Sequence, residues 1–524
     1  MSRRYAAIAV CALAFACCAS SAVTGAGLGA AVAKPVAKYG TNVHLGNGQS
    51  LAIGYVGTPP VSTSQPYSNV QVIDSSGAYT VCSPTGGSRT LSPLIAPMRA
   101  NTTYTAPNYY PTNLPATEQP DVGAANEMTR QALLRGYSSY VVAASSTGVG
   151  AEPIVNLDKG GVTGAYEAGI CELRTILALA TGTVGVEAVI WTQGEADTGY
   201  APSFETTYEA ALVTLQGHYQ ADVPALTGQS GNVVLVLSQQ NSSGYYSVPE
   251  FNSSGQAQLK SIGKTGMYVS GAKYQYTYYT NNPHLINGAE YRKMGEKYAE
   301  ALWNITNGSG WLPLYPTSVA TNSSTQYTVN FNVPDPPLVF DVSLSPPHTS
   351  GVLSNVWAGA EGFEAYDEPG AAILGATNAS PIVIQTDLSL SITTGTYVAI
   401  GGVFGNTAAN GLWTATAVDA THFSLQGSTG NGAWSGATVG SPQVQILLPI
   451  SSVSISGSGV VVNLTHAATY HLTLGYAETP DFASTQAGGC PTHRCGLLRD
   501  SDPFAGADGF AQPNYALEFY WAVN

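Results

Sequence analysis

The chain has 524 residues, of which 10% are charged, and a formal net charge of −14. This length exceeds what one hydrophobic core normally organises, so two or three domains are expected. The acidic charge opposes nucleic acid and anionic membrane surfaces as partners, because both require a basic surface. The 44% content of hydrophobic residues opposes intrinsic disorder.

The N-terminus begins with MSRR and continues with the apolar run YAAIAVCALAFACCASSA. A short basic start, an apolar run and small residues predict a secretory signal peptide over residues 1–22, and therefore a secreted protein, extracellular or periplasmic. The alternative is a membrane anchor, but the run is short for a spanning helix and small residues follow it. We therefore expect no membrane span.

Four cysteines remain beyond this segment: Cys82, Cys171, Cys490 and Cys495. An even number suits an oxidising compartment. The short spacing predicts a disulfide between Cys490 and Cys495, which leaves Cys82 to pair with Cys171. A zinc site is the alternative, but no second close pair completes four ligands, so no metal is expected.

The first half of the chain alternates between short apolar runs and helical patterns. Continuous apolar runs predict strands buried on both faces of a parallel sheet. The predicted strands span residues 69–74, 140–145, 186–191 and 232–238, and the predicted helices span 124–135, 165–180, 203–219 and 287–303. Asn287 is a suitable N-cap for the last helix. The alternation indicates an α/β domain over residues 38–305.

After Trp311 the helical periodicity disappears, and residues 444–464 alternate with a period of two. This pattern predicts a β-rich C-terminal domain over residues 312–524. Within it, the stretch 397–434 looks like a small module of phage tail and surface proteins, which suggests an insertion over residues 380–440. Asn410-Gly411 predicts a hairpin turn inside that insertion.

The stretch LGNGQSLAIG contains the first candidate for chemistry, Ser50. A glycine-rich turn before a helix-like start offers backbone N–H groups to an oxyanion. The stretch is not the G-x-S-x-G elbow, because Ala52 occupies the final glycine position. Taken alone, it favours an ordinary loop serine.

The second candidate stretch is VIWTQGEADTG, in which Gln193, Glu195 and Asp197 follow a predicted buried strand. Ligands of open α/β sheets bind beyond the carboxyl ends of the strands. The Gln193 amide could donate to a developing oxyanion. The alternative is that Glu195 and Asp197 only cap the helix that begins near Pro202.

The third candidate is His284, in the loop before the last predicted helix of the α/β domain. A general base must be held on a stiff element within reach of the nucleophile. The other histidines of this domain are His44, on the first strand, and His218, which we expect at a helix C-terminus interacting with the helix dipole.

Together, GQS near the N-terminus, W-x-Q-G-E-x-D in mid-domain and a histidine before the last helix resemble the SGNH-type carbohydrate esterases. The similar branch contains sialate O-acetylesterases and acetylxylan esterases. The resemblance extends to ATEQPDVGAANEMTRQAL, which looks like the second sequence block of the family and contains Gly123. It covers most of the chain from Lys38 to Trp303. It implies an SGNH-hydrolase-like three-layer α/β/α domain.

The resemblance also implies the roles of the site residues. Ser50 is the nucleophile and His284 the base. The oxyanion hole consists of Ser50, Gly123 and Gln193, and Gln49 and Asp197 contact the substrate.

One position departs from the family pattern. The family places Asp three residues before the histidine, and here that residue is Asn281. Asn281 could orient His284 without a negative charge, or Glu195 could supply the acid. A shifted register of the motif and a loss of activity are the other two alternatives.

The sequence thus predicts a secreted serine esterase that removes O-acetyl groups from an oligo- or polysaccharide, without cofactor or metal. The competing hypothesis is a surface or tail-type adhesin that binds a glycan with little or no turnover. The sequence specifies neither the sugar nor the oligomeric state.

Overall fold

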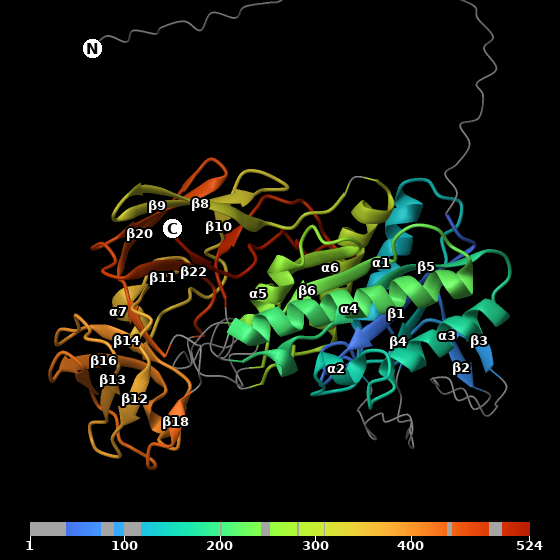
Figure 1. Ribbon diagram of the computed structural model, residues 1–524. Helices are drawn as coiled ribbons and strands as arrows, with labels where there is room; N and C mark the ends of the chain where they lie inside the picture. The colour runs from blue at the N-terminus through green and yellow to red at the C-terminus, as the bar shows by residue number, and fades with distance from the viewer. Residues whose placement is uncertain are drawn as a thin grey trace, which may run out of the picture.

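The computed structural model describes residues 38–74, 89–98, 117–199, 202–242, 252–279, 282–308, 310–437, 443–480 and 495–523. Figure 1 shows a part of mixed helices and strands from the first half of the chain, beside a β-rich part from the second half. This mixed α/β part followed by a β-rich part is as predicted. The proposed signal peptide lies outside the described residues, and the domain boundaries stay predictions.

The first part is built on one twisted sheet with the strand order β3-β2-β4-β1-β5-β6-β7. All neighbouring strands pair in parallel except β3, which pairs antiparallel with β2. The strands are β1 Thr41–Gly48, β2 Val70–Asp74, β3 Arg89–Pro93, β4 Val142–Ser146, β5 Val184–Thr192, β6 Leu235–Gln239 and β7 Met267–Ala272.

The centre of this sheet is its topological switch point. Strand β1 lies between β4 and β5; β2, β3 and β4 lie on one side of it and β5, β6 and β7 on the other. Ligand crevices of open α/β sheets form where the strand order reverses, beyond the carboxyl ends. The residues that follow Gly48 therefore enter the expected crevice.

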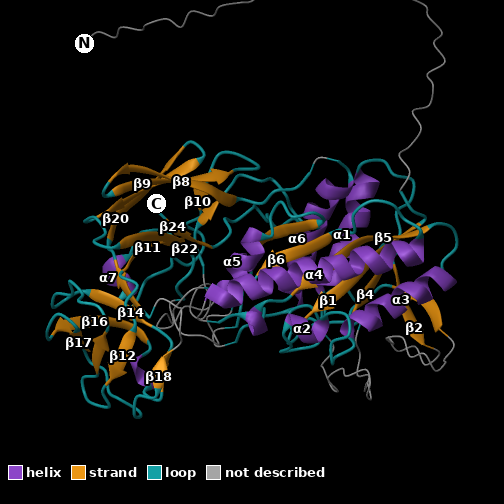
Figure 2. Cartoon of the chain, viewed as in Figure 1, coloured by secondary structure: helices purple, strands orange, loops and turns teal. Residues whose placement is uncertain are grey.

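The helices of this part fall into two packing groups. Helices α1 and α6 pack on each other, while α4 packs on α2, α3 and α5. Figure 2 shows helices covering the strands of this sheet. The helices are α1 Pro120–Leu134, α2 Ile154–Leu157, α3 Ala165–Leu179, α4 Pro202–Thr227, α5 Ser253–Lys260 and α6 Gly288–Thr306. The predicted N-cap of α6 is confirmed, because the Asn287 side chain accepts the Glu290 N–H.

The expectation for His218 was wrong. Helix α4 continues to Thr227, so His218 lies inside the helix, and its Nδ1 is 2.9 Å from Asp158 Oδ1. A charge in a helix interior interacts with its side-chain neighbours rather than with the terminal dipole. His218 is therefore a structural residue.

The β-rich part contains a nine-stranded and a four-stranded sheet, both antiparallel. Figure 1 places β8, β9 and β20 in one region of this part and β12, β14 and β16 in another. The strands of the larger sheet are β11 Phe363–Glu368, β12 Ile373–Ala376, β13 Val383–Thr386, β14 Tyr397–Ile400, β16 Gly411–Ala417, β17 His422–Leu425, β19 Val444–Leu447, β22 His471–Tyr476 and β24 Phe519–Ala522. The smaller sheet consists of β8 Tyr315–Ser323, β9 Gln326–Asn332, β20 Ile450–Ser456 and β21 Gly459–Leu464. The short pairs are β10 Val339–Phe340 with β23 Leu498–Arg499, and β15 Val403–Phe404 with β18 Gly436–Ala437.

Buried side chains between Ala371 and Ile446 form a hydrophobic core separate from the main one. This second core overlaps the predicted insertion. The predicted Asn410-Gly411 hairpin turn was wrong: β14 ends at Ile400, and Gly411 already begins β16. The Asn410 side chain instead bonds the backbone N–H and C=O of Val403, which closes a longer connection.

Hydrogen bonds join the two parts at several points. Gln239, at the end of β6, exchanges two bonds with the backbone of Glu518, at 2.8 and 2.9 Å. The buried Lys297 of α6 lies 3.0 Å from Asp502 in the C-terminal tail. A contact surface that is both buried and hydrogen-bonded holds the parts in one arrangement.

Within the described ranges, no helix is long and apolar enough to cross a membrane. No group of three or more His, Cys, Asp or Glu side chains placed to hold a metal ion occurs among the same residues.

Candidate active site

Ser50 stands at the start of a helical turn directly beyond β1. Tyr55 N–H donates to the Ser50 carbonyl at 2.9 Å, and Ala52 N–H donates to Gln49 at 2.9 Å. A turn of this kind leaves its first backbone N–H groups free of intrahelical partners. Among the described residues, no hydrogen-bond acceptor is found for the Ser50 N–H or hydroxyl.

The loop after β4 lies against this turn. Val149 N–H donates to the Gly48 carbonyl at 2.9 Å, and a Cβ added to Gly150 would lie 3.9 Å from the Ser50 Cβ. The backbone of Gly150 is therefore beside the Ser50 side chain. A glycine there allows the close approach of chain to ligand that a side chain would block.

Gln49 connects the Ser50 turn to the loop after β5. Its side chain is buried, and its Oε1 accepts the N–H groups of Gly194 at 3.4 Å and Ala196 at 3.2 Å. The sequence predicted substrate contact for Gln49. Its hydrogen bonds brace the Ser50 turn against the loop after β5.

Gln193 is fixed at both ends of its amide. Its Oε1 accepts from the Tyr208 hydroxyl at 2.6 Å, and its Nε2 donates to the Glu152 carbonyl at 3.3 Å and to Asp197. Asp197 Oδ2 also accepts the Ile154 N–H at 2.8 Å. Asp197 thus orients Gln193 and joins the loops after β4 and β5. Burial raises the pKa of Asp197, which the hydrogen bonds from Gln193 and Ile154 oppose.

Glu195 forms a buried ion pair with a residue that the sequence analysis did not single out. Lys273 Nζ lies 2.6 Å from Glu195 Oε1, and both side chains are almost fully buried. Ser242 donates to the same oxygen at 3.2 Å. The second oxygen, Oε2, is buried without a hydrogen-bond partner among the described residues. Among the described residues, one oxygen of this carboxylate is therefore without a donor.

His284 is buried, and its two ring nitrogens differ. Its Nδ1 contacts Asn282 Oδ1, which also accepts the His284 backbone N–H at 3.1 Å. The other nitrogen, Nε2, is buried without a partner among the described residues. The ring lies on Tyr55, with centroids 4.7 Å apart. The Asn282 carbonyl oxygen fixes the tautomer with Nδ1–H, which leaves Nε2 as the acceptor.

Burial is the main influence on the basicity of His284. Burial lowers the pKa of His284 to about 4, since it disfavours imidazolium, while Glu195 raises the pKa and Lys273 lowers it. The resting imidazole is neutral at physiological pH. A neutral imidazole is the form that accepts a proton.

Gly123 was expected to supply an oxyanion N–H, and its position gives it another role. It lies inside α1, where a Cβ would come 2.6 Å from the Arg292 carbonyl of α6. A Cβ added to Gly295 of α6 would lie even closer to the Pro120 carbonyl, at 2.0 Å. These glycines permit the close packing of the two helices, and we replace the predicted oxyanion role of Gly123 by this packing role.

The site therefore combines four loop regions beyond the sheet. Pairwise bonds and contacts link residues of these loops. The residues are Gln49, Ser50, Tyr55, Gly150, Gln193, Glu195, Asp197, Lys273, Asn282 and His284. Asn281 lies outside the described residues. Lys273 could have been predicted from its place directly after a strand, because β7 ends at Ala272.

No protein-family model and no curated protein matches the chain. Several solved structures are similar in shape. The carbohydrate acetylesterase XAC1771 from Xanthomonas citri is 12% identical, with a TM-score of 0.43 over 91% of this chain and 80% of its own. The carbohydrate acetylesterase Est24 from Sinorhizobium meliloti is 13% identical, with a TM-score of 0.25 over 50% of this chain and 96% of its own.

A third similar structure, the M. smegmatis aryl esterase, is 15% identical, with a TM-score of 0.25 over 50% of this chain and 96% of its own. The chain thus resembles esterases that include carbohydrate acetylesterases. Identities and TM-scores of this size do not transfer an activity, so the function has to be argued from the chain's own residues.

Proposed function

We propose that this protein is a serine esterase that removes O-acetyl groups from a carbohydrate. The observation that carries the proposal is the state of His284. Its Nδ1 is held by Asn282, its Nε2 has no partner among the described residues, and its ring lies 4.7 Å from the ring of Tyr55, whose backbone N–H donates to the Ser50 carbonyl. An oriented, neutral base within reach of a nucleophile is what acyl transfer requires, and in this proposal His284 reaches the Ser50 hydroxyl.

In the proposed reaction, Ser50 Oγ attacks the ester carbonyl carbon while His284 Nε2 accepts the hydroxyl proton. The tetrahedral intermediate collapses when His284 returns that proton to the leaving sugar oxygen, which gives the free alcohol and an acyl-Ser50 ester. Water then attacks the acyl group with His284 again as base, and acetate and free Ser50 result.

The negative oxygen of the intermediate needs donors near Ser50. The Ser50 N–H is suitably placed at the start of its turn, and the Gly150 backbone lies beside it. Gln193 remains a proposed donor, because its Nε2 contact with the Glu152 carbonyl is long, at 3.3 Å, and an oxyanion could replace it. Gln49 and Asp197 position these donors rather than the substrate. The mechanism needs no metal or cofactor.

The substrate class rests on the sequence resemblance to carbohydrate esterases. We propose an acetylated oligo- or polysaccharide as the partner. Secretion and the disulfide between Cys490 and Cys495 belong to the same proposal, since a secreted enzyme meets an oxidising compartment. Cys490 lies outside the described residues, so the pairing stays a prediction.

The decisive experiment measures hydrolysis of a chromogenic acetyl ester by the purified chain and by Ser50→Ala. Removal of a nucleophile from a coupled group costs on the order of 10⁶ in kcat. Ser203→Ala, on the first turn of α4, is a matched control that should keep full activity. If the wild-type protein binds acetylated glycans but hydrolyses neither these glycans nor the chromogenic acetyl ester, it is a binding protein. If Ser50→Ala keeps its activity, another residue is the nucleophile.

A further inference from the structure

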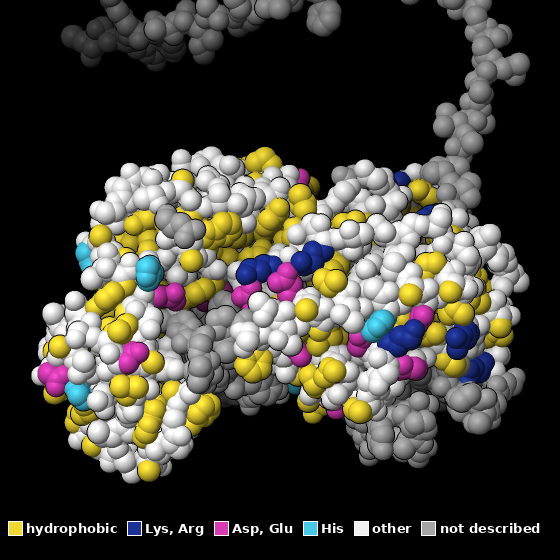
Figure 3. Space-filling view, viewed as in Figure 1, with side chains coloured by type: hydrophobic (Ala, Val, Ile, Leu, Met, Phe, Trp, Pro, Cys, Tyr) yellow, Lys and Arg dark blue, Asp and Glu magenta, His cyan; other side chains and the backbone are white. Residues whose placement is uncertain are grey.

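A second cleft opens at the boundary between the two parts of the molecule. It has a volume of about 600 Å³, and α4, α5, β8, β11 and β24 line it. Figure 3 shows basic and acidic side chains gathered on the middle of the visible face, with hydrophobic side chains beside them. Clefts of 300–1,000 Å³ with mixed apolar and polar walls are typical of small-ligand sites.

The walls of this cleft are joined by hydrogen bonds. The Gln256 side chain of α5 donates to the Tyr520 carbonyl at 3.2 Å and accepts the Tyr520 N–H at 3.1 Å. This reciprocal pair fixes α5 of the α/β part against β24 of the β-rich part. A preformed cleft loses little conformational entropy when a ligand binds.

Two half-buried aromatic side chains line it from different strands. Tyr315 comes from β8 and Trp521 from β24, and Leu259 with Ile262 adds aliphatic surface beside them. An aromatic ring has a negative face that attracts C–H groups. A sugar ring presents C–H groups on its faces and hydroxyls on its rim, so it matches aromatic side chains accompanied by polar groups.

The charged groups among the lining residues of the cleft are two carboxylates and one ammonium. Lys260 pairs with Glu205, while Glu368 accepts from Gln445 and Thr473 and from the Tyr520 hydroxyl. The only lysine among the lining residues is thus neutralised, and the cleft has an excess of negative charge. This balance repels anionic polymers and suits a neutral sugar, whose hydroxyls donate to carboxylates.

Helix α5 connects this cleft to the candidate active site. Gln258 Nε2 donates to the Gln193 carbonyl at 2.8 Å, and the Ser253 hydroxyl accepts the Gly199 N–H at 3.0 Å. The same helix contributes Gln256, Leu259 and Lys260 to the cleft. Helix α5 therefore contacts both the cleft and the loop after β5 that carries Gln193.

We propose that this cleft is an accessory subsite that holds a neutral glycan chain while an acetyl group on the chain reaches Ser50. The identity of the ligand rests on the proposed esterase function, whereas the cleft itself is defined by Tyr315, Trp521 and the Gln256–Tyr520 bonds. Occupation of the cleft raises the local concentration of polymeric substrate at the active site, as in other two-site binding.

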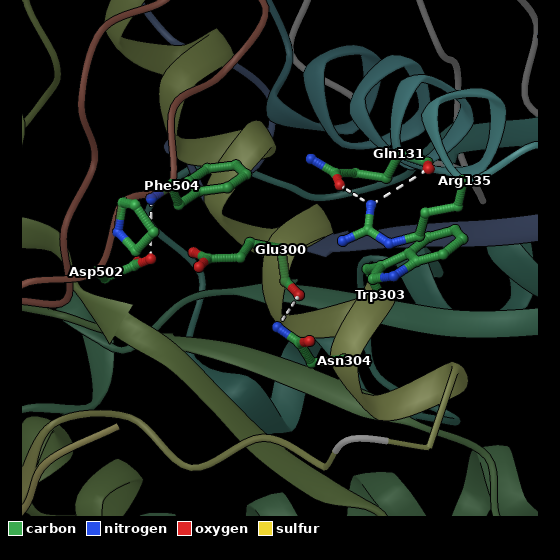
Figure 4. Close-up of a pocket in the computed structure, with 8 residues that line it drawn as sticks. Gln131, Arg135, Glu300, Trp303, Asn304, Asp502 and Phe504 are labelled. Carbon is green, nitrogen blue, oxygen red and sulfur yellow. Dashed lines mark hydrogen bonds between the residues drawn. The ribbon is translucent and has the colours of Figure 1, made fainter. Parts of the chain in front are cut away.

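A smaller cavity of 220 Å³ lies at the far end of α6 and is shown in Figure 4. Of its lining residues, Glu300 and Asp502 are paired with Lys297 at 2.5 and 3.0 Å, and Arg135 lies over the Trp303 ring. Both carboxylates thus have a cationic partner from the protein itself, and this cavity takes no part in the proposal.

The test compares a polymer with a small ester on the full chain. The double variant Tyr315→Ala/Trp521→Ala should lower kcat/KM on soluble acetylated xylan about tenfold, mainly through KM, because the glycan loses both aromatic contacts. It should leave kcat/KM on p-nitrophenyl acetate unchanged. Phe404→Ala, an aromatic that is 50% exposed on β15, is the matched control and should change neither.

Ala522→Arg provides a second variant at an exposed position of the cleft wall, where a bulky side chain should block the glycan without entering the core. It should reproduce the selective loss on the polymer. Equal losses on both esters, or no loss on the polymer, would overturn the proposal.

Binding to deacetylated xylan separates this proposal from the proposed esterase function. In affinity electrophoresis the wild type and Ser50→Ala should be retarded by deacetylated xylan but not by polygalacturonate, and both cleft variants should not be retarded. If neither acetylated xylan nor p-nitrophenyl acetate is hydrolysed, the esterase proposal fails. The retardation by deacetylated xylan still tests whether the cleft binds a neutral glycan. If deacetylated xylan does not retard the wild-type protein, the proposal that the cleft binds a glycan is overturned.

Discussion

In the β-rich part, both oxygens of the buried Glu364 are occupied, whereas in the α/β part Glu195 has one oxygen without a partner among the described residues. Glu364 Oε1 accepts from His348 Nε2 at 3.1 Å and from the N–H groups of Glu478 and Thr479, and Oε2 accepts from the hydroxyls of Tyr366 and Thr479. Burial opposes ionisation of Glu364, but these bonds outweigh it, and its pKa is lowered.

Glu195 has two donors, Lys273 and Ser242, and both bind Oε1. Each neighbouring histidine has one buried ring nitrogen without a partner among the described residues, but the partners of the other nitrogen differ, since His348 bonds a carboxylate while His284 bonds a neutral amide. A buried polar group without its full set of bonds costs stability, and such groups are retained where they do chemistry. From this comparison we infer that Glu364 stabilises the fold and that the residues around Glu195 take part in function.

The largest test of this comparison replaces each histidine in turn. His284→Ala should lose activity on the order of 10⁶ in kcat, because it removes the base from a coupled pair, and should keep a near-native Tm. His348→Ala should keep kcat but lower the free energy of unfolding by about 1–3 kcal/mol, since Glu364 loses a buried partner. Steady-state kinetics and thermal unfolding of both variants measure the two effects. The comparison is wrong if His348→Ala loses activity without loss of stability.

The next test removes the cation beside Glu195. Lys273→Met leaves a buried carboxylate without its counter-charge, which costs about 3–5 kcal/mol of the free energy of unfolding. The pKa of His284 should also rise, because Lys273 lowers it while Glu195 raises it. The acid limb of kcat/KM should therefore move to higher pH. Lys264→Met, which breaks a half-exposed pair with Glu209, is the control and should change neither quantity measurably. An unchanged Tm for Lys273→Met would contradict the buried ion pair.

Several parts of this arrangement could be predicted from the sequence. Helices α3 and α6 begin where their apolar periodicity and, for α6, the Asn287 cap indicate. Ser50 and Gln193 could be placed at one sheet edge, because parallel strands end at the same edge and each residue follows a strand.

The remaining parts depend on contacts between distant segments. Gly123 looks the same in sequence whether it packs against Arg292 or faces an oxyanion, and only the approach of α6 decides. Lys273 was missed because β7, MYVSGA, is interrupted by Ser and Gly and was not predicted as a strand, although Lys273 follows it directly. The Asn282 contact depends on the local turn, since Asn281 and Asn282 are chemically identical neighbours.

The smallest expected effect concerns the group that orients His284. The wild-type acid limb should lie near pH 4, because burial lowers the pKa of His284 to about 4 and only the neutral ring accepts a proton. Activity should thus be lost as the pH falls through that value. Asn282→Asp places a carboxylate at Nδ1 and favours imidazolium, so the pKa should rise. One pKa unit corresponds to about 1.4 kcal/mol, and kcat/KM at neutral pH should rise roughly tenfold.

Asn281→Asp is the matched control, because it tests the position where the family pattern has Asp. If Asn282→Asp raises kcat/KM and moves the acid limb upward while Asn281→Asp does neither, the orienting group lies one residue nearer to His284 than the pattern predicts. If Asn281→Asp alone has the effect, the described contact with Asn282 does not act in catalysis. If neither variant has an effect and Glu195→Gln reduces kcat, then the unoccupied oxygen of Glu195 supplies the charge that stabilises imidazolium, and Lys273 limits how strongly it can do so.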